Sequence, residues 1–263
     1  MSGLDGLGSL TFMCNICSSI CTVNMRDIHR EVVSCFSCHS TVRNRSVVHM
    51  VSMNLFGRSM PIAEFPVRED IVGIGMSDFE PMTQRFAQKM SFTNTYYHQE
   101  PRLDITDIDP SMEHRLDFMI SSEVFEHVPP PVSRAFHGSR RLLKDTGFLV
   151  LTVPYVSQPG VKTREHFPRL NDFRVFALAD GRTILVNRTS EGEVEVRGDL
   201  VFHGGAGLVL EMRLFSEESL REELRDAGFG EVTVFTEPQF QFGIYESNTW
   251  SRPILARAQA PGH

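Results

Sequence analysis

Two neighbouring segments decide the fold: Phe118-Met-Ile-Ser-Ser-Glu-Val-Phe-Glu-His-Val-Pro-Pro130 and Arg141-Leu-Leu-Lys-Asp-Thr-Gly-Phe-Leu-Val-Leu-Thr-Val-Pro154. Residues 118–121 and 148–153 are short apolar runs with the length of buried strands. Between them, residues 130–144 open with prolines, which suit the first turn of a helix. Strands that are apolar almost throughout are typical of a parallel sheet covered on both faces. The segments therefore predict a strand–helix–strand unit of an α/β fold.

The same alternation extends on both sides of this unit. Ser216 is a good N-cap for a helix that reaches Ala227, and Gly228 ends it. The other predicted elements are a helix at 44–56, an apolar segment at 60–65, a strand at 71–76, a helix at 80–90 and strands at 94–97, 231–235 and 254–257.

Between Tyr155 and Leu214 the pattern changes to short strands joined by Asp-Gly, Glu-Gly and Gly-Gly turns. We interpret residues 156–213 as an insertion that forms a β-rich cap over the carboxyl ends of the sheet strands, where open α/β sheets bind ligands. The strands predicted within it are 173–177, 183–187, 193–197 and 209–214.

All five cysteines lie in the first 38 residues, and four of them form Cys14-x-x-Cys17 and Cys35-x-x-Cys38. The 17 residues between the pairs (35 − 17 − 1 = 17) match a four-cysteine zinc site. Disulfides are the alternative, which the lack of a secretion signal disfavours, and packing alone would not produce two equal spacings. Four thiolates complete the coordination of Zn²⁺, so we predict a structural ion in a zinc ribbon at 1–43, followed by an α/β domain at 44–263. Cys21 is then a spare thiol, and His39 a neighbour rather than a ligand.

The quoted segments resemble class I S-adenosylmethionine-dependent methyltransferases, as does the later phrase Phe215-Ser-Glu-Glu-Ser-Leu220 with Ala227-Gly-Phe229. Together with the four cysteines, they make the chain look like the subset of that family with an N-terminal zinc ribbon. The resemblance covers about residues 70 to 258. It implies a doubly wound, Rossmann-like, mostly parallel sheet and S-adenosylmethionine as cofactor.

The resemblance also implies where the cofactor's base would bind. Asp104 lies 22 residues before Glu126 (126 − 104 = 22), as an Asp after the family's third strand does, and the Ile105 N–H is the expected second adenine contact. The alternative is that Asp104 only caps a turn. Ser122, at the end of the strand 118–121, is a further expected cofactor contact.

The family's glycine-rich loop has no clean copy in this chain. Gly73 and Gly75, followed by Ser77 and Asp78, can stand for that loop. However, the distance from Gly75 to Glu126 (126 − 75 = 51) favours the second strand. In that register residues 60–65 form the first strand, and Ser77 or Asp78 holds the ribose hydroxyls.

Methyl transfer is an in-line displacement that can need a base for the acceptor's proton. Histidine suits this task because its pKa lies near neutrality. We therefore select His166 and His127, which follow the predicted strands at 148–153 and 118–121, as catalytic candidates. His203, in the insertion, is a third candidate, and a structural or surface role is the alternative for each.

Composition narrows the class of protein. The chain has 41% hydrophobic and 22% charged residues, the balance of a soluble globular protein. Its net charge of −7 argues against a general nucleic-acid binder. No run approaches the roughly 18 apolar residues of a membrane helix, and residues 1–13 do not resemble a signal peptide, so we expect a cytoplasmic protein without a membrane partner.

Three functions fit the sequence. The favoured one is a methyltransferase acting on a small molecule, such as a sugar or a secondary metabolite, because a β-rich cap can close a small pocket. The second is a nucleic-acid or protein methyltransferase that uses the zinc ribbon for recognition. The third is a methyltransferase-fold binding or assembly protein that has lost methylation, as the degenerate glycine loop suggests.

Overall fold

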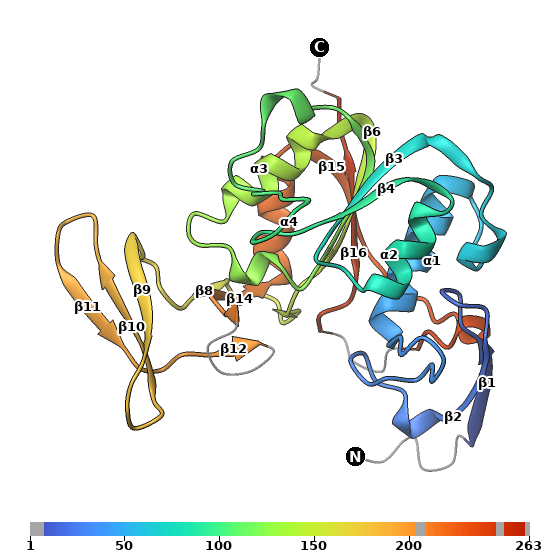
Figure 1. The fold of residues 1–263 in the computed structure, drawn as a ribbon, viewed down its shortest axis with the longest axis horizontal. Helices are drawn as coiled ribbons and strands as arrows, with labels where there is room; N and C mark the ends of the chain where they lie inside the picture. The colour runs from blue at the N-terminus through green and yellow to red at the C-terminus, as the bar shows by residue number, and fades with distance from the viewer. Residues whose placement is uncertain (1–7, 204–208, 246–249, 261–263) are drawn as a thin grey trace.

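The centre of the molecule is a six-stranded sheet, seen in a computed structural model that describes residues 8–203, 209–245 and 250–260 (Figure 1). Its strand order is β15-β16-β6-β5-β3-β4. The strands are β3 (Arg68–Met76), β4 (Met90–Thr95), β5 (Leu116–Ser122), β6 (Leu143–Thr152), β15 (Phe229–Val234) and β16 (Ile254–Ala258). Only β16 runs against the others. This mostly parallel order with one reversed strand is the class I methyltransferase fold, which confirms the predicted fold class.

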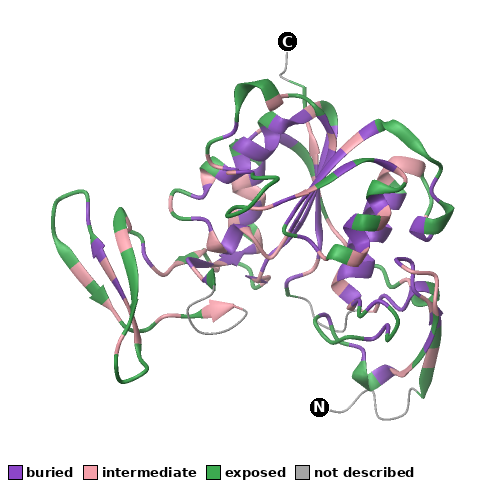
Figure 2. Ribbon diagram, viewed as in Figure 1, coloured by how far each residue is buried: buried purple, intermediate pink, exposed green. Residues whose placement is uncertain are grey.

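Two pairs of helices cover the sheet, one pair on each face (Figure 1). One face carries α1 (Val42–Phe56) and α2 (Glu80–Ala87), and the other carries α3 (Ser133–Leu142) and α4 (Glu217–Asp226). The Ser216 hydroxyl accepts the Ser219 N–H at the start of α4, as predicted. Each face has its own apolar core, and Figure 2 shows the sheet between them as buried. The chain is therefore doubly wound.

The prediction of a first strand at residues 60–65 was wrong. After Pro61 these residues form a 3-10 turn, η2 (Ile62–Glu64). A proline at either end, Pro61 and Pro66, removes backbone donors that a strand would need. The first strand of the sheet along the chain is instead β3, which lies between β4 and β5, and Ser77 begins the connection from β3 to α2.

A layer of stacked aromatic rings explains one of the two glycines in β3. The Phe118 ring stacks on Phe92 and on Phe148, with ring centroids 5.7 Å apart in both pairs. Gly73 pairs with Phe92 and with Phe118 across the sheet, and a Cβ atom on it would lie 2.4 Å from the Phe118 ring. Any larger residue at position 73 would collide with the Phe118 ring, so the packing of the rings requires glycine there.

The predicted third strand before Asp104 is reduced to a single parallel bridge, between Tyr96 and Arg102. The next segment is anchored on α3, where a Cβ atom on Gly138 would lie 2.0 Å from the Ile105 carbonyl oxygen. A later turn, η3 (Pro110–Met112), leads to β5. The segment around Asp104 is therefore positioned by α3 rather than by a strand.

The insertion has two parts. A sheet of β9 (Asp172–Ala177), β10 (Thr183–Arg188) and β11 (Val194–Arg197) projects away from the rest of the molecule and is largely exposed (Figures 1 and 2). The other strands, β7 (Tyr155–Val156), β8 (Arg164–Glu165), β12 (Phe202–His203), β13 (Val209–Leu210) and β14 (Arg213–Ser216), lie near the core. The strand predicted at 209–214 is thus broken at Glu211 and Met212.

The N-terminal cysteine module, residues 8–41, consists of a hairpin and the cysteine turns. Strands β1 (Ser9–Met13) and β2 (Ile20–Asn24) pair, and the turn η1 (Met25–Asp27) follows. The module packs against η5 (Phe240–Phe242) from the far end of the chain. No helix in the described part of the chain has the length and apolar character needed to span a membrane.

Candidate active site and metal centre

Glu126 is a fully buried carboxylate just beyond the end of β5. It lies in the turn η4 (Phe125–His127), and its side chain has no exposed surface. Neither carboxylate oxygen accepts a hydrogen bond from the described residues. Burial raises the pKa of Glu126 well above its ordinary value, because a charge in an apolar environment loses its hydration.

His127 lies beside this carboxylate with its ring orientation fixed. Nδ1 lies 2.9 Å from the Leu210 carbonyl oxygen and donates to it, which leaves the lone pair on Nε2. Nε2 is 3.6 Å from Oε1 of Glu126. Burial lowers the pKa of His127, so the neutral imidazole is favoured.

Glu211 connects the other two candidate histidines. One of its carboxylate oxygens lies 2.9 Å from Nε2 of His166, and the other lies 2.9 Å from Nε2 of His203. Nδ1 of His203 is 3.8 Å from Oε1 of Glu126, and the His203 ring packs edge-on against His127 with centroids 4.7 Å apart. The structure therefore gathers all three sequence-predicted histidines around two carboxylates; their catalytic role stays a prediction.

Arg213 connects the segments that carry these histidines and carboxylates. Its guanidinium is fully buried and donates to the carbonyl oxygens of Phe125 and Val128 at 2.8 and 2.6 Å, and to Glu165 at 2.7 Å. The neighbouring Met212 N–H donates to the Glu126 carbonyl oxygen, and the Met212 carbonyl accepts the His166 N–H, both at 2.8 Å. The segment 211–213 thus fixes η4 and the His166 loop together.

Sequence reasoning missed Glu211 and Arg213, and it used Glu126 only as a landmark. The available signal was the placement of two charged residues inside the apolar run from Val209 to Phe215. Charges in such a run are expected to be paired or functional, because unpaired burial is costly.

Asp78 is a second buried carboxylate, in the loop after β3. One oxygen accepts the Met76 N–H at 2.9 Å, whereas Oδ1 has no partner among the described residues. Burial raises the pKa of Asp78 to about 6, opposed by the nearby Ser122 hydroxyl. Ser77 beside it has a φ of 55°, in the left-handed region that costs a non-glycine residue energy.

These residues fit a bound nucleoside in part. The partnerless Oδ1 of Asp78, close to Ser122, suits a ligand hydroxyl at the carboxyl ends of β3 and β5. The two glycines do not form a cradle, because Gly73 lies among the rings and a Cβ on Gly75 would lie 2.9 Å from Asp78 Oδ2. Because β3 is the first strand of the sheet along the chain, Gly75 ends the first strand and not the second, which is the position that the spacing to Glu126 favoured.

Asp104 caps a turn. Its Oδ1 accepts both the N–H and the hydroxyl of Thr106, at 3.0 and 2.7 Å. Its neighbour Ile105 is buried against α3. The alternative interpretation of Asp104 therefore holds for its local geometry, and its contact with adenine stays a prediction.

The cysteine module reaches the same edge of the sheet. Arg30 donates to Glu123, directly after β5, at 2.6 Å and to the Ser251 carbonyl oxygen at 2.7 Å. Glu123 has a φ of 56°, so its unusual backbone is held by a partner from the N-terminus. The module thus lies beside the expected cofactor site.

The four predicted cysteine ligands form one cluster. The Sγ–Sγ distances are 3.7 Å for Cys14 and Cys38, and 3.6 Å for Cys35 with both Cys17 and Cys38. A tetrahedral zinc site with Zn–S bonds of about 2.3 Å has S–S edges of roughly 3.8 Å. The residues after the two motifs, Ser18 and His39, have φ values of 63° and 60°, so both turns share one backbone shape. The cluster fits a tetrahedral metal ion.

A buried cation lies next to these thiols. Arg45 has no exposed surface and donates to the hydroxyl of Ser34 at 2.7 Å and to the Phe242 and Gly243 carbonyls at 2.9 Å each. It also donates to the Ser40 hydroxyl at 3.2 Å, which lies 3.4 Å from Cys14 Sγ. The guanidinium therefore offsets the negative charge that four metal-bound thiolates would carry.

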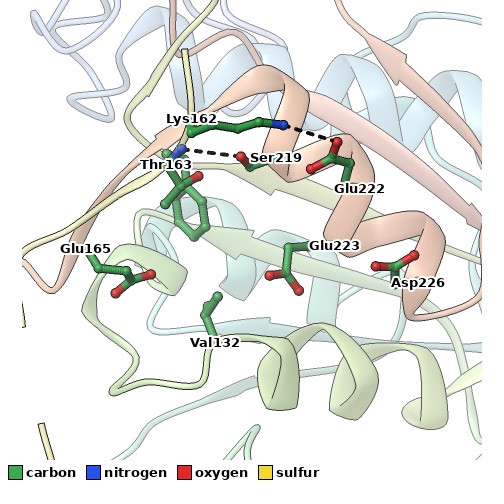
Figure 3. Close-up of a pocket in the computed structure, with 9 residues that line it drawn as sticks. Val132, Lys162, Thr163, Glu165, Ser219, Glu222, Glu223 and Asp226 are labelled. Atoms are coloured by element: carbon green, nitrogen blue, oxygen red, sulfur yellow. Dashed lines mark hydrogen bonds and ion pairs between the residues drawn. The ribbon is translucent and has the colours of Figure 1, made fainter. Parts of the chain in front are cut away.

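A pocket of about 250 Å³ lies elsewhere, between α4 and the segment at 162–165 (Figure 3). Four of its nine lining side chains are acidic, and Lys162 is paired with Glu218 and Glu222. Burial also raises the pKa of Glu223 there. None of its lining residues belongs to β3 or β5, so this pocket does not match the expected cofactor edge.

Comparisons with known proteins give only distant likenesses. No protein-family model and no curated protein sequence matches the chain. Similar solved structures include 1,6-didemethyltoxoflavin-N1-methyltransferase of Burkholderia thailandensis, at 13% identity and a TM-score of 0.43, covering 83% of this chain and 77% of that one. A sugar N-methyltransferase of Streptoalloteichus has 11% identity and a TM-score of 0.45, covering 82% and 86%. The CurJ carbon methyltransferase has 17% identity and a TM-score of 0.47, covering 84% and 56%. The fold assignment rests on the strand order of the sheet.

Proposed function

We propose that the chain is an S-adenosylmethionine-dependent methyltransferase that acts on a hydroxylated small molecule, such as a sugar or a secondary metabolite. The observation that carries this proposal is the position of Glu126 and His127 in the turn after β5 of a class I sheet. His166, His203 and Glu211 lie around this turn and complete the histidine–glutamate cluster. In open α/β sheets, ligands bind at this edge. The four clustered cysteines support a structural Zn²⁺ ion that has no open position for catalysis.

The chain's own residues divide into two groups at this edge. Asp78, Ser77 and Ser122 would hold the ribose hydroxyls, and Asp104 with Ile105 would hold the base. S-adenosylmethionine, when bound, supplies an electrophilic methyl group. Gly73 is not part of this set, because it is a packing glycine.

His166 is the base in this proposal. Its Nε2–H donates to Glu211, which leaves the lone pair of Nδ1 to take a proton from the acceptor hydroxyl. Glu211 is a positioning residue, since it fixes the tautomer and stabilises the imidazolium that forms. His127, whose lone pair is on Nε2, faces Glu126 and is the second catalytic candidate.

Equilibrium dialysis with labelled S-adenosylmethionine tests the proposal. We expect saturable binding that Asp78→Ala weakens at least tenfold and that Asp104→Ala also weakens, while the matched exposed variant Asp109→Ala binds normally. No binding at high protein concentration would overturn the enzyme assignment. It would favour the second candidate, a binding protein with a methyltransferase fold, which the inward packing of Gly73 and Gly75 already supports.

A further inference from the structure

We propose that Glu126, His127 and His203 bind a divalent transition-metal ion at a second metal site, separate from the four cysteines. One donor atom from each of the three residues lies within 4.8 Å of the other two. This site goes beyond the proposed function and does not require it, because the ion would bind without any methyl donor.

The unsatisfied carboxylate is the first argument. Glu126 is fully buried, and neither of its oxygens accepts a hydrogen bond from the part of the chain that the structure describes. Buried carboxylates are normally hydrogen-bonded, paired with a cation or coordinated to a metal. The groups beside Glu126 Oε1 are imidazole nitrogens of His127 and His203 at 3.6 and 3.8 Å, too long for hydrogen bonds.

These separations suit a common metal ligand geometry. Metal–ligand bonds of about 2.1 Å place tetrahedral donor atoms roughly 3.4 Å apart. The two distances to Glu126 Oε1 exceed that value by only a few tenths of an ångström. The third separation, between the two imidazole nitrogens, is within 4.8 Å, so the side chains must move together to bring all three donors onto one ion.

The orientation of the two rings is the second, independent argument. Metal-bound histidines almost always donate their other N–H to a carbonyl or a carboxylate. His127 donates from Nδ1 to the Leu210 carbonyl, and His203 donates from Nε2 to Glu211. In both rings the remaining nitrogen is the one that lies near Glu126. The tautomers needed for metal binding are thus already set by the surroundings.

The donor set indicates the class of ion. Two imidazoles and one carboxylate suit Zn²⁺, Fe²⁺, Mn²⁺ or Co²⁺, and three protein ligands leave open positions for water or a substrate oxygen. His166 shares Glu211 with His203, so an acceptor oxygen on the ion would lie near the proposed base. In this arrangement His127 is a ligand, and His166 alone handles the proton.

Titration of the full-length chain with Co²⁺, after loading with one Zn²⁺ per chain to fill the cysteine site, tests the second site by visible absorption. We expect one Co²⁺ per chain with weak d–d bands and without the intense thiolate charge-transfer band of a cysteine site. Glu126→Gln, which keeps the size of the side chain, should weaken binding at least tenfold, and Glu211→Gln should weaken it 10- to 100-fold. His137→Ala, an exposed histidine on α3, is the matched control and should bind normally.

Other outcomes would overturn the site. These are no saturable Co²⁺ binding, spectra of thiolate coordination only, or equal affinity in the Glu126→Gln variant. Circular dichroism and the zinc content of each variant show that it is folded. Since no methyl donor is present, the result is independent of the dialysis test of the proposed function.

Discussion

Two buried carboxylates, Asp78 and Glu126, lie just after the carboxyl ends of β3 and β5. Asp78 and Glu126 both have raised pKa values because burial disfavours their charged forms, and each has an oxygen without a partner among the described residues. Structural carboxylates are usually better satisfied. The cost of keeping these two at neighbouring strand ends is consistent with a ligand that pairs with them.

Asp78 makes stability depend on pH in a defined direction. Its pKa of about 6 in the folded chain is above the ordinary 3.8, so its contribution to the free energy of unfolding is fully present below pH 3.8 and is lost as the pH rises through about 6. In Asp78→Asn, which keeps an acceptor for the Met76 N–H, this loss is removed. Between pH 5 and 7.5 the wild-type chain should lose roughly 1 to 2 kcal/mol relative to the variant.

Urea denaturation followed by circular dichroism across this pH range measures the difference. Asp109→Asn is the matched control: hydrogen bonds from Ser111 lower the pKa of the exposed Asp109, so its contribution is lost only as the pH falls below 3.8, and its profile should parallel that of the wild-type chain in this range. Parallel pH profiles for the wild-type chain and Asp78→Asn would contradict the buried charge at Asp78.

Two short elements far apart in the sequence, η4 and β14, form the frame of the candidate site. Arg213 begins β14, and its guanidinium holds two carbonyl oxygens of the η4 region and the Glu165 carboxylate of β8. Glu211, just before β14, holds His166 and His203. The frame therefore depends on one buried cation for its position.

Arg213→Met should lower the free energy of unfolding by about 3 kcal/mol, because Glu165 and two carbonyl oxygens lose their partner. Arg182→Met, on the exposed β9–β10 turn, should change it by less than about 0.5 kcal/mol. Denaturant unfolding of both variants gives the comparison. A double-mutant cycle with Glu165→Gln would show no coupling if Arg213 acted through packing alone.

At the scale of the whole molecule, the cysteine module is joined to the methyltransferase fold by a shared core. One apolar cluster includes Cys14 and Cys35 together with Phe118 and Val150 of the sheet. Arg45 of α1 further connects the thiols to η5. Loss of the metal should therefore affect the sheet as well as the module.

Chelation of zinc should lower the melting temperature of the chain by more than about 10 °C in a single transition. The measurement uses the Glu126→Gln variant, which lacks the proposed second metal site, so that chelation removes zinc from the cysteine site alone. Added Zn²⁺ should restore the original transition. Scanning calorimetry with metal analysis makes the measurement. Two separate transitions, with the upper one unchanged, would show that the module and the sheet are energetically independent.

Features that depend on local pattern could be predicted from the amino-acid sequence. Apolar runs and caps such as Ser216 predicted most helices and strands, and the cysteine spacing predicted the thiol cluster, because each signal lies within a few turns of chain. The histidines were selected because they follow strand ends. The segment at 60–65 failed because its apolar content resembled a strand, although its prolines prevent sheet pairing.

Which of these residues lie in contact became clear from the folded chain. Folding placed Gly73 among stacked rings, and it placed His203 between Glu126 and Glu211, which lie 85 residues apart (211 − 126 = 85). The reason is physical: a buried polar side chain needs partners such as those that Glu211 gives to His166 and His203, and these partners can come from any part of the chain. A charged residue inside an apolar run can be recognised in the sequence, but the residues that contact it are known only from the folded structure.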